Sequence, residues 1–479
     1  MKNKTQRKHL ILISLLTAAV FAFSVCGCGN QRQASESGTT VSDSTVGATA
    51  DEGTTAQATT AAASKRLAES DISVTKTINN SEDGGHAITA DGENADYSHV
   101  LVTKTGEADG DEADFYGENA AVFGTNGGTL NLNNIVVKTD GTHANGVFSY
   151  GDGTTVNISD SYINTVGNCS GGLMTTGGGT MNASNLTIET SGNSSAAIRS
   201  DRGGGTVNVD GGYYATSGKG SPVIYSTADI TVSNAEMVST ASQGVVVEGK
   251  NAVTLNNVDL TADNNTKNSD KSSYYQAVMI YQSMSGDAAQ GLSSFTMNGG
   301  SLVNKNGDVF FVNNTSTEIS LSNASITNKG DGVFLRAAAA GWGSEGNNGG
   351  QVNLNASKQT INGDMLVDSI SKLNLYLKDN SAYTGAINPG GAQGEVYVEI
   401  ENGSTWTLTA DSYISSLTCD ANAIKLNGHK LYVDGKEYSE GSASKGSAVE
   451  ITVSSSSGGH EAPPDGNKPE GNPPAKPGT

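Results

Sequence analysis

The chain has 479 residues and a formal net charge of -21 at pH 7, and 16% of its residues are charged. This acidic balance excludes nucleic acid as a partner, because binding phosphate requires clustered Lys and Arg. The sequence holds four cysteines and no CxxC motif, so neither a disulfide framework nor a CxxC metal or redox site is expected. Cys169 and Cys419 are predicted to be isolated, small apolar residues.

The N-terminal segment predicts export. Four basic residues within the first eight positions precede a nearly unbroken apolar run over residues 10–25. This run is short for a membrane span and is followed by small residues, which favours a signal peptide over residues 1–27. Val25-Cys26-Gly27-Cys28 resembles the lipobox of bacterial lipoproteins, which implies that Cys28 carries a lipid. The mature protein would then lie on the extracellular face of the bacterial cell membrane; a signal peptide cut elsewhere would make it a secreted protein.

Composition divides the remaining chain into three parts. Residues 28–71 are rich in Ser, Thr and Ala, cannot bury enough apolar surface to offset the entropy of ordering, and are predicted to form a disordered tether. Residues 454–479 are rich in Pro and Gly and are predicted to form a disordered tail. The folded part, residues 72–453, is too long for one compact core and suits a repeat array.

A repeat of about two dozen residues runs through the folded part. Each repeat starts with a short strand in which apolar and polar residues alternate, as in Leu130 and Leu132. A polar pair follows, and its Asn, Asp and Gly residues tolerate the left-handed backbone of a sharp corner. These pairs are Asn133-Asn134, Ser159-Asp160, Ser184-Asn185, Asp210-Gly211, Ser233-Asn234, Asn256-Asn257, Asn298-Gly299 and Ser322-Asn323. A second strand follows the corner, and a third comes after a Gly/Asn/Ser loop.

Three short strands per repeat, with no helical periodicity, predict an all-β parallel β-helix of about a dozen coils. The polar corners resemble the asparagine ladder of the right-handed, pectin-lyase-like β-helix proteins, in which Asn residues stack between the second and third sheets. This resemblance covers most of residues 120–360. Residues 406–417 and 424–431 resemble the capping coils of surface β-helix proteins from anaerobic bacteria, and a cap is needed because an open end would expose unpaired strand edges.

The orientation of the third strand stays open between two registers. In one register, a column of large apolar residues faces outward and marks a binding face or a surface covered by another segment. That column is Phe148, Met174, Ile198, Ile224, Val246, Met279, Phe310 and Phe334. In the other register these residues form the core, and Arg199 faces outward.

The resemblance also implies enzymatic alternatives, since the fold includes polysaccharide lyases and glycoside hydrolases. The sequence has no Asp-Asp, Gly-His-Gly or Arg-x-Lys motif of the galacturonan hydrolases. If the chain is a lyase, Arg199, Asp201 and Arg202 would hold a uronate carboxylate or supply the base; the alternative is a salt-bridged turn. The histidines are expected to be solvated loop residues, namely His86, His99, His143 and His429.

Two insertions lengthen the repeat and predict a ligand site. The first lies between Asp263 and Leu292 and carries Tyr274 and Tyr275, and the second, residues 337–350, carries Trp342 and Asn347. Insertions in a solenoid project as loops from one side, and aromatic faces beside amide groups suit sugar rings. The alternative is that these aromatic residues pack their own loops against the rod.

Calcium is a further alternative at Asp109, Asp111 and Asp114, which place hard oxygen ligands close together in the sequence. Their spacing differs from an EF-hand loop, and a solvated acidic loop is the preferred interpretation; no other cofactor is expected. Taken together, the sequence predicts a lipid-anchored surface protein that adheres to, or binds, a polysaccharide or a host or neighbour-cell surface glycan without catalysis. The alternatives are a polysaccharide lyase or glycoside hydrolase, and a passive surface spacer.

Overall fold

The computed structural model describes residues 66–267, 269–401 and 403–453. The predicted signal peptide, Cys28, the tether up to residue 65 and the tail at 454–479 lie outside these residues. Within the described part, nearly all regular structure is β-strand; the helices are one 3-10 turn, η1 (Glu69–Asp71), and one short α-helix, α1 (Asp111–Phe115). The all-β prediction is therefore confirmed.

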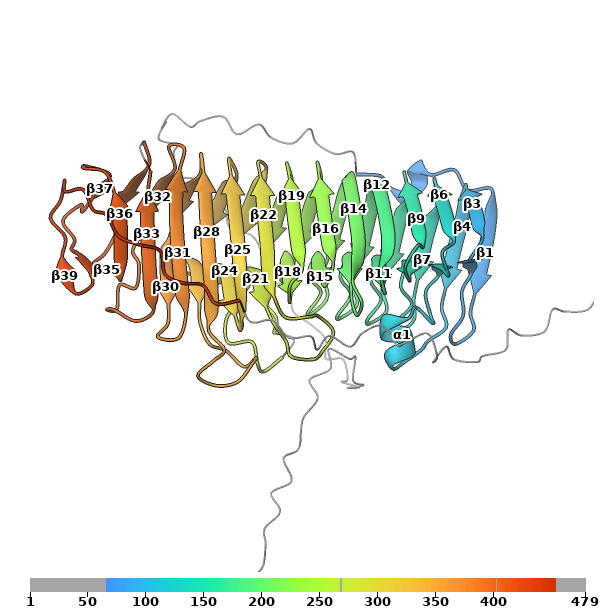
Figure 1. Ribbon diagram of the computed structural model, residues 1–479. Helices are drawn as coiled ribbons and strands as arrows, with labels where there is room; N and C mark the ends of the chain where they lie inside the picture. The colour runs from blue at the N-terminus through green and yellow to red at the C-terminus, as the bar shows by residue number, and fades with distance from the viewer. Residues whose placement is uncertain (1–65, 268, 402, 454–479) are drawn as a thin grey trace, which may run out of the picture.

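The strands stack into an elongated solenoid, in which the strands of one coil pair in parallel with the equivalent strands of the next; the last strand, β39, instead pairs antiparallel with β38 (Figure 1). Two runs of strands form the largest sheet and meet at the polar corner. The first run contains β3 (Asn94–Ser98), β6 (Thr129–Asn133), β9 (Thr155–Ser159), β12 (Gly179–Thr190), β14 (Gly205–Thr216), β16 (Asp229–Ser233), β19 (Ala252–Asn256), β22 (Leu292–Asn298), β25 (Thr315–Ser322), β28 (Gly350–Ser357), β31 (Lys372–Lys378), β33 (Glu395–Ile400) and β36 (Ser416–Cys419). The second run contains β1 (Lys76–Asn80), β4 (Val100–Lys104), β7 (Val136–Thr139), β10 (Tyr162–Thr165), the continuing β12 and β14, β17 (Glu236–Ser239), β20 (Asp259–Ala262), β23 (Ser301–Asn304) and β26 (Ser325–Asn328).

The third strand of each coil contributes to a separate 11-stranded sheet. Its members are β2 (Ile88–Asp91), β5 (Val122–Thr125), β8 (Val147–Tyr150), β11 (Leu173–Thr176), β13 (Ile198–Ser200), β15 (Ile224–Ser226), β18 (Val245–Glu248), β21 (Gln276–Tyr281), β24 (Asp308–Asn313), β27 (Val333–Ala337) and β30 (Asp364–Val367). Two small sheets complete the C-terminal end. They contain β29 (Thr360–Asn362), β32 (Ala382–Thr384), β34 (Thr405–Thr407) and β37 (Ile424–Lys425), and then β35 (Ser412–Ile414), β38 (Leu431–Val433) and β39 (Lys436–Glu437).

The polar corner adopts the left-handed backbone that the sequence predicts. Asn134, Asp160 and Asn185 have φ of 50°, 48° and 50°, and Gly211 takes the equivalent place with φ of 74°. Their side chains also connect the coils, since the Asn185 amide donates to Asp160. Residues that adopt left-handed φ at little cost therefore fix the bend between the two runs at the same point of each coil.

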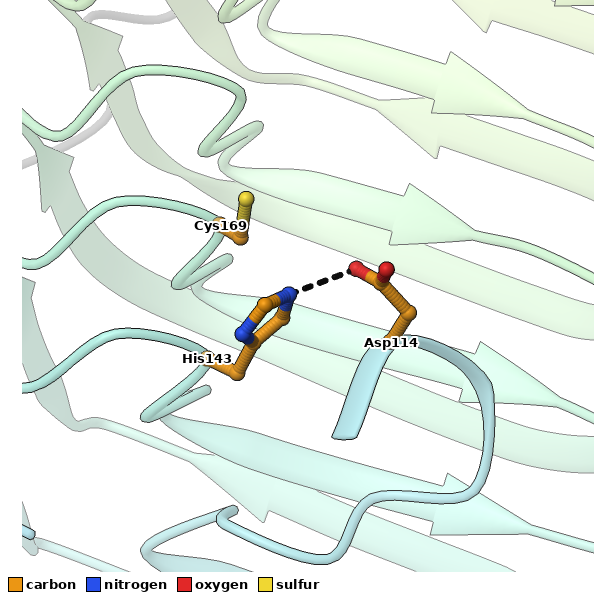
Figure 2. A group of neighbouring side chains, drawn as sticks. All are labelled: Asp114, His143 and Cys169. Carbon is orange, nitrogen blue, oxygen red and sulfur yellow. Dashed lines mark hydrogen bonds and ion pairs between the residues drawn. The ribbon is translucent and has the colours of Figure 1, made fainter. Parts of the chain in front are cut away.

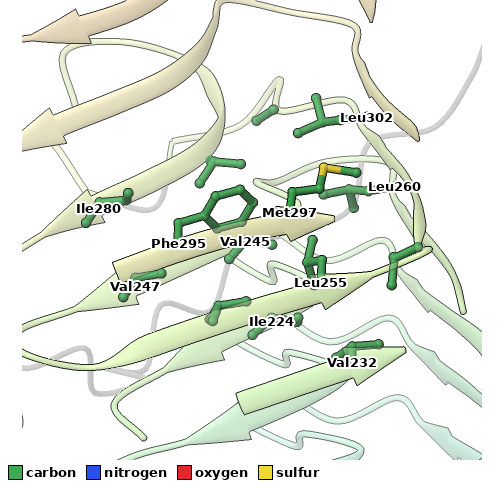
Figure 3. Close-up of a cluster of buried hydrophobic side chains, with 14 of the residues drawn as sticks. Ile224, Val232, Val245, Val247, Leu255, Leu260, Ile280, Phe295, Met297 and Leu302 are labelled. Atoms are coloured by element: carbon green, nitrogen blue, oxygen red, sulfur yellow. The ribbon is translucent and has the colours of Figure 1, made fainter. Parts of the chain in front are cut away.

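The core is one continuous apolar column inside the solenoid, to which all three strands of a coil contribute (Figure 3). Leu255, Phe295 and Met297 are fully buried, as are Val245 and Ile280 from the 11-stranded sheet. Burying a side chain of this size contributes about 1.5–3 kcal/mol. Because each coil buries its apolar residues against its neighbours, the interior holds the array together along its whole length.

The third-strand register is the same in every coil from β5 to β27, and neither expected alternative describes all coils. Phe148, Met174, Val246 and Met279 face outward, as the first alternative has it. Ile198, Ile224, Phe310 and Phe334 instead lie in the core. The outward column therefore reads Phe123, Phe148, Met174, Arg199, Tyr225, Val246, Met279, Phe311 and Arg336.

The last coils end in the two small sheets, and a further segment folds back along the rod. Trp406 is buried and stacks on Tyr383 at a centroid distance of 5.6 Å. Residues 444–452, which we call the C-terminal strap, then cross the outer face of the largest sheet (Figure 1). The strap is fixed by the Val449 amide, which donates to Asn374 at 2.9 Å, and by the Thr452 carbonyl, which accepts from Ser316 at 2.7 Å.

Candidate functional site

The outer face of the 11-stranded sheet is covered in two places by segments that leave the coil. Near the N-terminal end, the segment around α1 covers Phe123, Phe148 and Met174, and the Thr176 hydroxyl donates to the Phe115 carbonyl at 2.6 Å. Further along, the second insertion covers Val246, Met279 and Phe311. The outward apolar column is thus a surface covered by other segments of the chain, rather than a bare stripe.

Between these two covered regions the column changes to Arg199 and Tyr225. The Arg199 side chain is buried, and both its Nε and Nη2 donate to one carboxylate oxygen of Asp201, at 3.2 and 2.6 Å. Burial works against the arginine charge, but Asp201 raises the pKa of Arg199. Burial also raises the pKa of Asp201 to about 6, against the opposing effect of Arg199. The two form an internal ion pair in which each neutralises the other.

Arg202 connects the α1 segment to the first insertion. Its guanidinium donates to Asp287 of the first insertion at 3.0 Å and to Asp111 of α1 at 3.0 Å, and it lies over the Phe115 ring at 3.7 Å. The structure therefore brings Arg199, Asp201 and Arg202 together at one place on the sheet. The charges of both arginines are neutralised by carboxylates of the protein, and the ion pairs of Arg202 position the loops around the neighbouring pocket.

That pocket is a small cavity of about 100 Å³ between the two insertions and the sheet. Tyr225 of β15, Glu248 of β18 and Tyr281 of β21 form its floor, because they face outward from neighbouring strands. Asp287 lines it from the first insertion and Trp342 from the second. The Trp342 ring meets Tyr281 edge to face at 5.1 Å. Segments distant in sequence therefore close one aromatic, polar cavity.

Glu248 is the chemically distinctive residue of the pocket. It is 1% exposed, and its Oε2 accepts hydrogen bonds from the Tyr225 hydroxyl and, at 3.1 Å, from the Tyr281 hydroxyl. Its Oε1 has no hydrogen-bond partner of good geometry among the described residues. Burial raises the pKa of Glu248 to about 7, although hydrogen bonds from Ser283 and Tyr225 oppose the shift. A carboxyl with this pKa takes up and releases protons near neutral pH.

The residues expected to bind a ligand are separated by the structure. Trp342 lines the pocket, whereas Tyr274 packs between Phe311, at 5.3 Å, and the Arg336 guanidinium, at 4.1 Å. Tyr275 has the Lys267 ammonium 5.1 Å from its ring. Asn347 is exposed and lines a separate hollow beside Asn314. Of the four, Trp342 therefore belongs to the pocket, and Tyr274 packs its loop against the rod.

The three aspartates expected to hold calcium point to different partners. Asp109 accepts the neighbouring Gly110 amide at 2.9 Å, Asp111 pairs with Arg202, and Asp114 accepts a hydrogen bond from His143 at 2.8 Å. Among the described residues, the three carboxylates do not form a group that could hold a metal ion. The grouping that the sequence places together is therefore separated by the fold.

Asp114 instead belongs to a buried group with His143 and Cys169, whose potential ligand atoms lie within 4.8 Å of one another (Figure 2). The solvated position expected for His143 is wrong: the ring is fully buried, and its Nδ1 donates to the Ala108 carbonyl at 2.9 Å. Burial opposes the charged imidazole, but Asp114 outweighs it and raises the pKa of His143. Cys169 is disulfide-bonded, contrary to expectation, and Cys419 is a free thiol.

Sequence reasoning missed the residues that give the pocket its chemistry, namely Tyr225, Glu248, Tyr281 and Asp287. A usable signal exists for Glu248. It ends the run Val245-Val246-Val247-Glu248, two positions after the outward-facing Val246, so strand alternation places its carboxyl on the outer face. The identity of its tyrosine partners required the register between coils, which the sequence pattern gave incorrectly for β15.

Comparisons with known proteins leave the pocket as the principal guide to function. No family model matches the sequence, and no curated protein and no solved structure matches it either. Across the part of the chain that the structure describes, no helix has the length and apolar character needed to cross a membrane.

Proposed function

We propose that the protein is a lipid-anchored bacterial surface protein, with a right-handed, pectin-lyase-like β-helix that binds saccharide in the pocket between its two insertions. The observation that carries this proposal is the meeting of Trp342 with Tyr225, Tyr281 and Glu248 around one cavity. The lipobox-like sequence at Cys28, together with the resemblance of the repeat and its C-terminal coils to surface β-helix proteins, supports the surface location. The role is adhesive or glycan-binding rather than catalytic.

The pocket has the composition of a site for a sugar residue. Sugar rings offer an apolar face that packs on an aromatic ring and an edge of hydroxyl groups that require hydrogen-bond partners. Trp342 and Tyr281 supply aromatic surface, and Glu248 and Asp287 supply carboxylate oxygens. The cavity has room for one terminal residue or side branch rather than a continuous chain, because its volume is about 100 Å³.

A glycan array probed with the full-length protein tests this proposal, with Trp342→Ala as the diagnostic variant. We expect binding to at least one class of glycan and a loss of roughly tenfold or more in affinity when Trp342 is removed. Tyr413→Ala is the matched control, since Tyr413 stacks on Tyr432 at 4.9 Å in the distant C-terminal sheet. Binding that survives Trp342→Ala would place the site elsewhere, and no binding at all would favour a passive spacer.

A specific observation favours a second candidate function, hydrolysis or elimination at a glycosidic bond. Glu248 has a pKa of about 7 and faces the pocket near Asp287, as a general acid or base requires. In this case Glu248, rather than Arg199, Asp201 or Arg202, would transfer the proton, because those three are engaged in ion pairs. Uronic-acid polysaccharides and neutral glycans should be assayed for unsaturated products and new reducing ends. Turnover that disappears in Glu248→Gln would establish catalysis.

The lipid anchor is tested separately from ligand binding. Labelling of the cells with a fatty-acid analogue should mark the wild-type protein, and Cys28→Ser should abolish the label and move the protein from the membrane fraction into the medium. An unlabelled, secreted wild-type protein would contradict the anchor and leave the pocket proposal intact.

A further inference from the structure

The buried carboxylate of Glu248 defines what kind of ligand the pocket accepts. Two tyrosine hydroxyls hold its Oε2, so the carboxyl plane is fixed and Oε1 is the atom left without a partner of good geometry among the described residues. Ser283 also hydrogen-bonds to the Glu248 carboxyl, but its hydroxyl is shared with the Ser285 hydroxyl, at an oxygen–oxygen distance of 2.7 Å. A buried carboxylate oxygen without a full partner is costly, and a ligand group that satisfies it gains that free energy.

The charges around Glu248 leave a local excess of negative charge. Asp201 and Asp287 both act on Glu248 to disfavour its ionised form. The neighbouring cations are already neutralised, Arg199 by Asp201 at 2.6 Å and Arg202 by Asp287 at 2.9 Å. A cation entering the pocket would therefore pair with Glu248 without displacing an existing ion pair.

One further positive charge, that of Lys267, lies at the pocket, and its position means that it repels a bound cation only weakly. Lys267 is exposed, and its ammonium donates to the Ser273 carbonyl at 3.2 Å. Charges at the surface are screened by solvent and salt, whereas the buried Glu248 is screened much less. The aromatic wall adds attraction for a cation, since the faces of Trp and Tyr rings bind ammonium groups.

From this geometry we infer that the pocket selects a saccharide carrying a protonated amine, with the ammonium group bonded to Glu248 Oε1 and the sugar ring against Trp342. This inference rests on the proposed saccharide binding and adds the chemical class of the sugar, an amino sugar with a free amine. A neutral or N-acetylated sugar of the same shape could donate an O–H or N–H to Oε1, but it would bring no positive charge to pair with the carboxylate.

The test compares two ligands that differ at the amine alone. Isothermal titration calorimetry at pH 7 should measure the full-length protein against β-1,4-linked glucosamine oligomers and against the fully N-acetylated oligomers of the same length. We expect the free-amine oligomer to bind at least tenfold more tightly, because only its ammonium group forms an ion pair with the buried Glu248 carboxylate. Equal affinity, or tighter binding of the acetylated oligomer, would overturn the inference.

Glu248→Gln assigns the preference to the carboxylate. Gln keeps the size of the side chain and an oxygen that accepts the tyrosine hydroxyls, so the pocket should remain folded. The variant is expected to reduce the preference for the free amine to within about twofold, and the matched control Glu236→Gln, on an exposed position of β17, is expected to retain it. A preference that persists in Glu248→Gln would overturn the inference.

The outcomes separate this inference from the proposed function. If neither oligomer binds but the glycan array shows another glycan whose binding depends on Trp342, the amine selectivity is wrong and saccharide binding stands. If neither oligomer binds and the array is blank, both fail. A near-ultraviolet circular dichroism spectrum of Glu248→Gln that matches the wild type shows that the variant is folded.

Discussion

The outer faces of the two long sheets differ in how regularly their side chains repeat from coil to coil. On the largest sheet, Asn157, Asn182 and Asn208 occupy the same place in consecutive coils, and each side-chain amide donates to the asparagine before it, at 2.8, 2.9 and 3.0 Å. On the 11-stranded sheet, the equivalent column changes from Met174 to Arg199 and Tyr225. A residue that repeats in every coil can hydrogen-bond to its own copies in the neighbouring coils, and such a column forms scaffold. Where the residue type changes from coil to coil, the side chains need partners from outside the sheet, and the insertions supply them.

The largest expected effect comes from removing one member of the ion pair that interrupts the column. Arg199→Met leaves the buried Asp201 without its partner, and we expect a loss of about 3–5 kcal/mol in local stability. The exposed Arg66–Glu189 pair is the control, and Arg66→Met should cost less than about 1 kcal/mol. Thermal denaturation and hydrogen exchange of β13 and β15 measure the difference. The double variant Arg199→Met/Asp201→Asn should recover part of the loss, and a single variant as stable as the wild type would contradict the buried pair.

The second effect is a pH-dependent change at Glu248. Its pKa is raised to about 7 in the folded protein, so its contribution to stability is fully present below its ordinary pKa and is lost as the pH rises through about 7. Glu248→Gln removes this dependence. The free energy of unfolding of the variant, measured relative to that of the wild type, should therefore rise by up to about 3 kcal/mol from pH 4 to pH 8. Denaturation midpoints of the two proteins at both pH values give the result. A wild-type protein whose difference from Glu248→Gln is constant with pH would contradict the buried, protonated state.

The smallest effect is expected on the repeated face. Asn182→Ala removes the hydrogen bonds to Asn157 and from Asn208 in a half-buried ladder, and should destabilise the rod by about 1 kcal/mol. Binding to the pocket should be unchanged, because the ladder lies on the other sheet. A loss of ligand binding in Asn182→Ala would show that the two faces are coupled, and the division between scaffold and site would then be wrong.

The sequence predicted the scaffold because the scaffold is repeated. The Asn134, Asp160 and Asn185 corners recur at a fixed interval, and their backbone requirement is local, so the pattern located them correctly. Of the two third-strand registers that the sequence left open, the one that points Phe148 and Met279 outward is right at those residues and is off by one residue at Ile198 and Phe310. Runs such as Val309-Phe310-Phe311 are apolar on both faces here, so alternation could not show which residue points inward.

The sequence predicted only part of the site, because the residues that line the pocket lie far apart along the chain. Trp342 was expected to bind a ligand because it lies in an insertion, and it does line the pocket. Its partner Tyr281 lies at the end of a core strand, and Asp287 follows in a different loop, so their meeting depends on coil stacking and loop closure. The same reason explains Asp114, whose neighbour in space is His143 rather than Asp109 or Asp111.

The most direct test of the pocket uses the two tryptophans of the chain as reporters. Trp406 is buried in the C-terminal core and Trp342 lines the pocket, so Trp406→Phe leaves a protein whose tryptophan emission comes from the pocket. We expect the ligand found on the glycan array, added to Trp406→Phe, to change the intensity and wavelength of that emission in a saturable way, with the dissociation constant that calorimetry gives. Ligand binding without any change in the Trp342 emission would contradict the assignment of this pocket as the binding site.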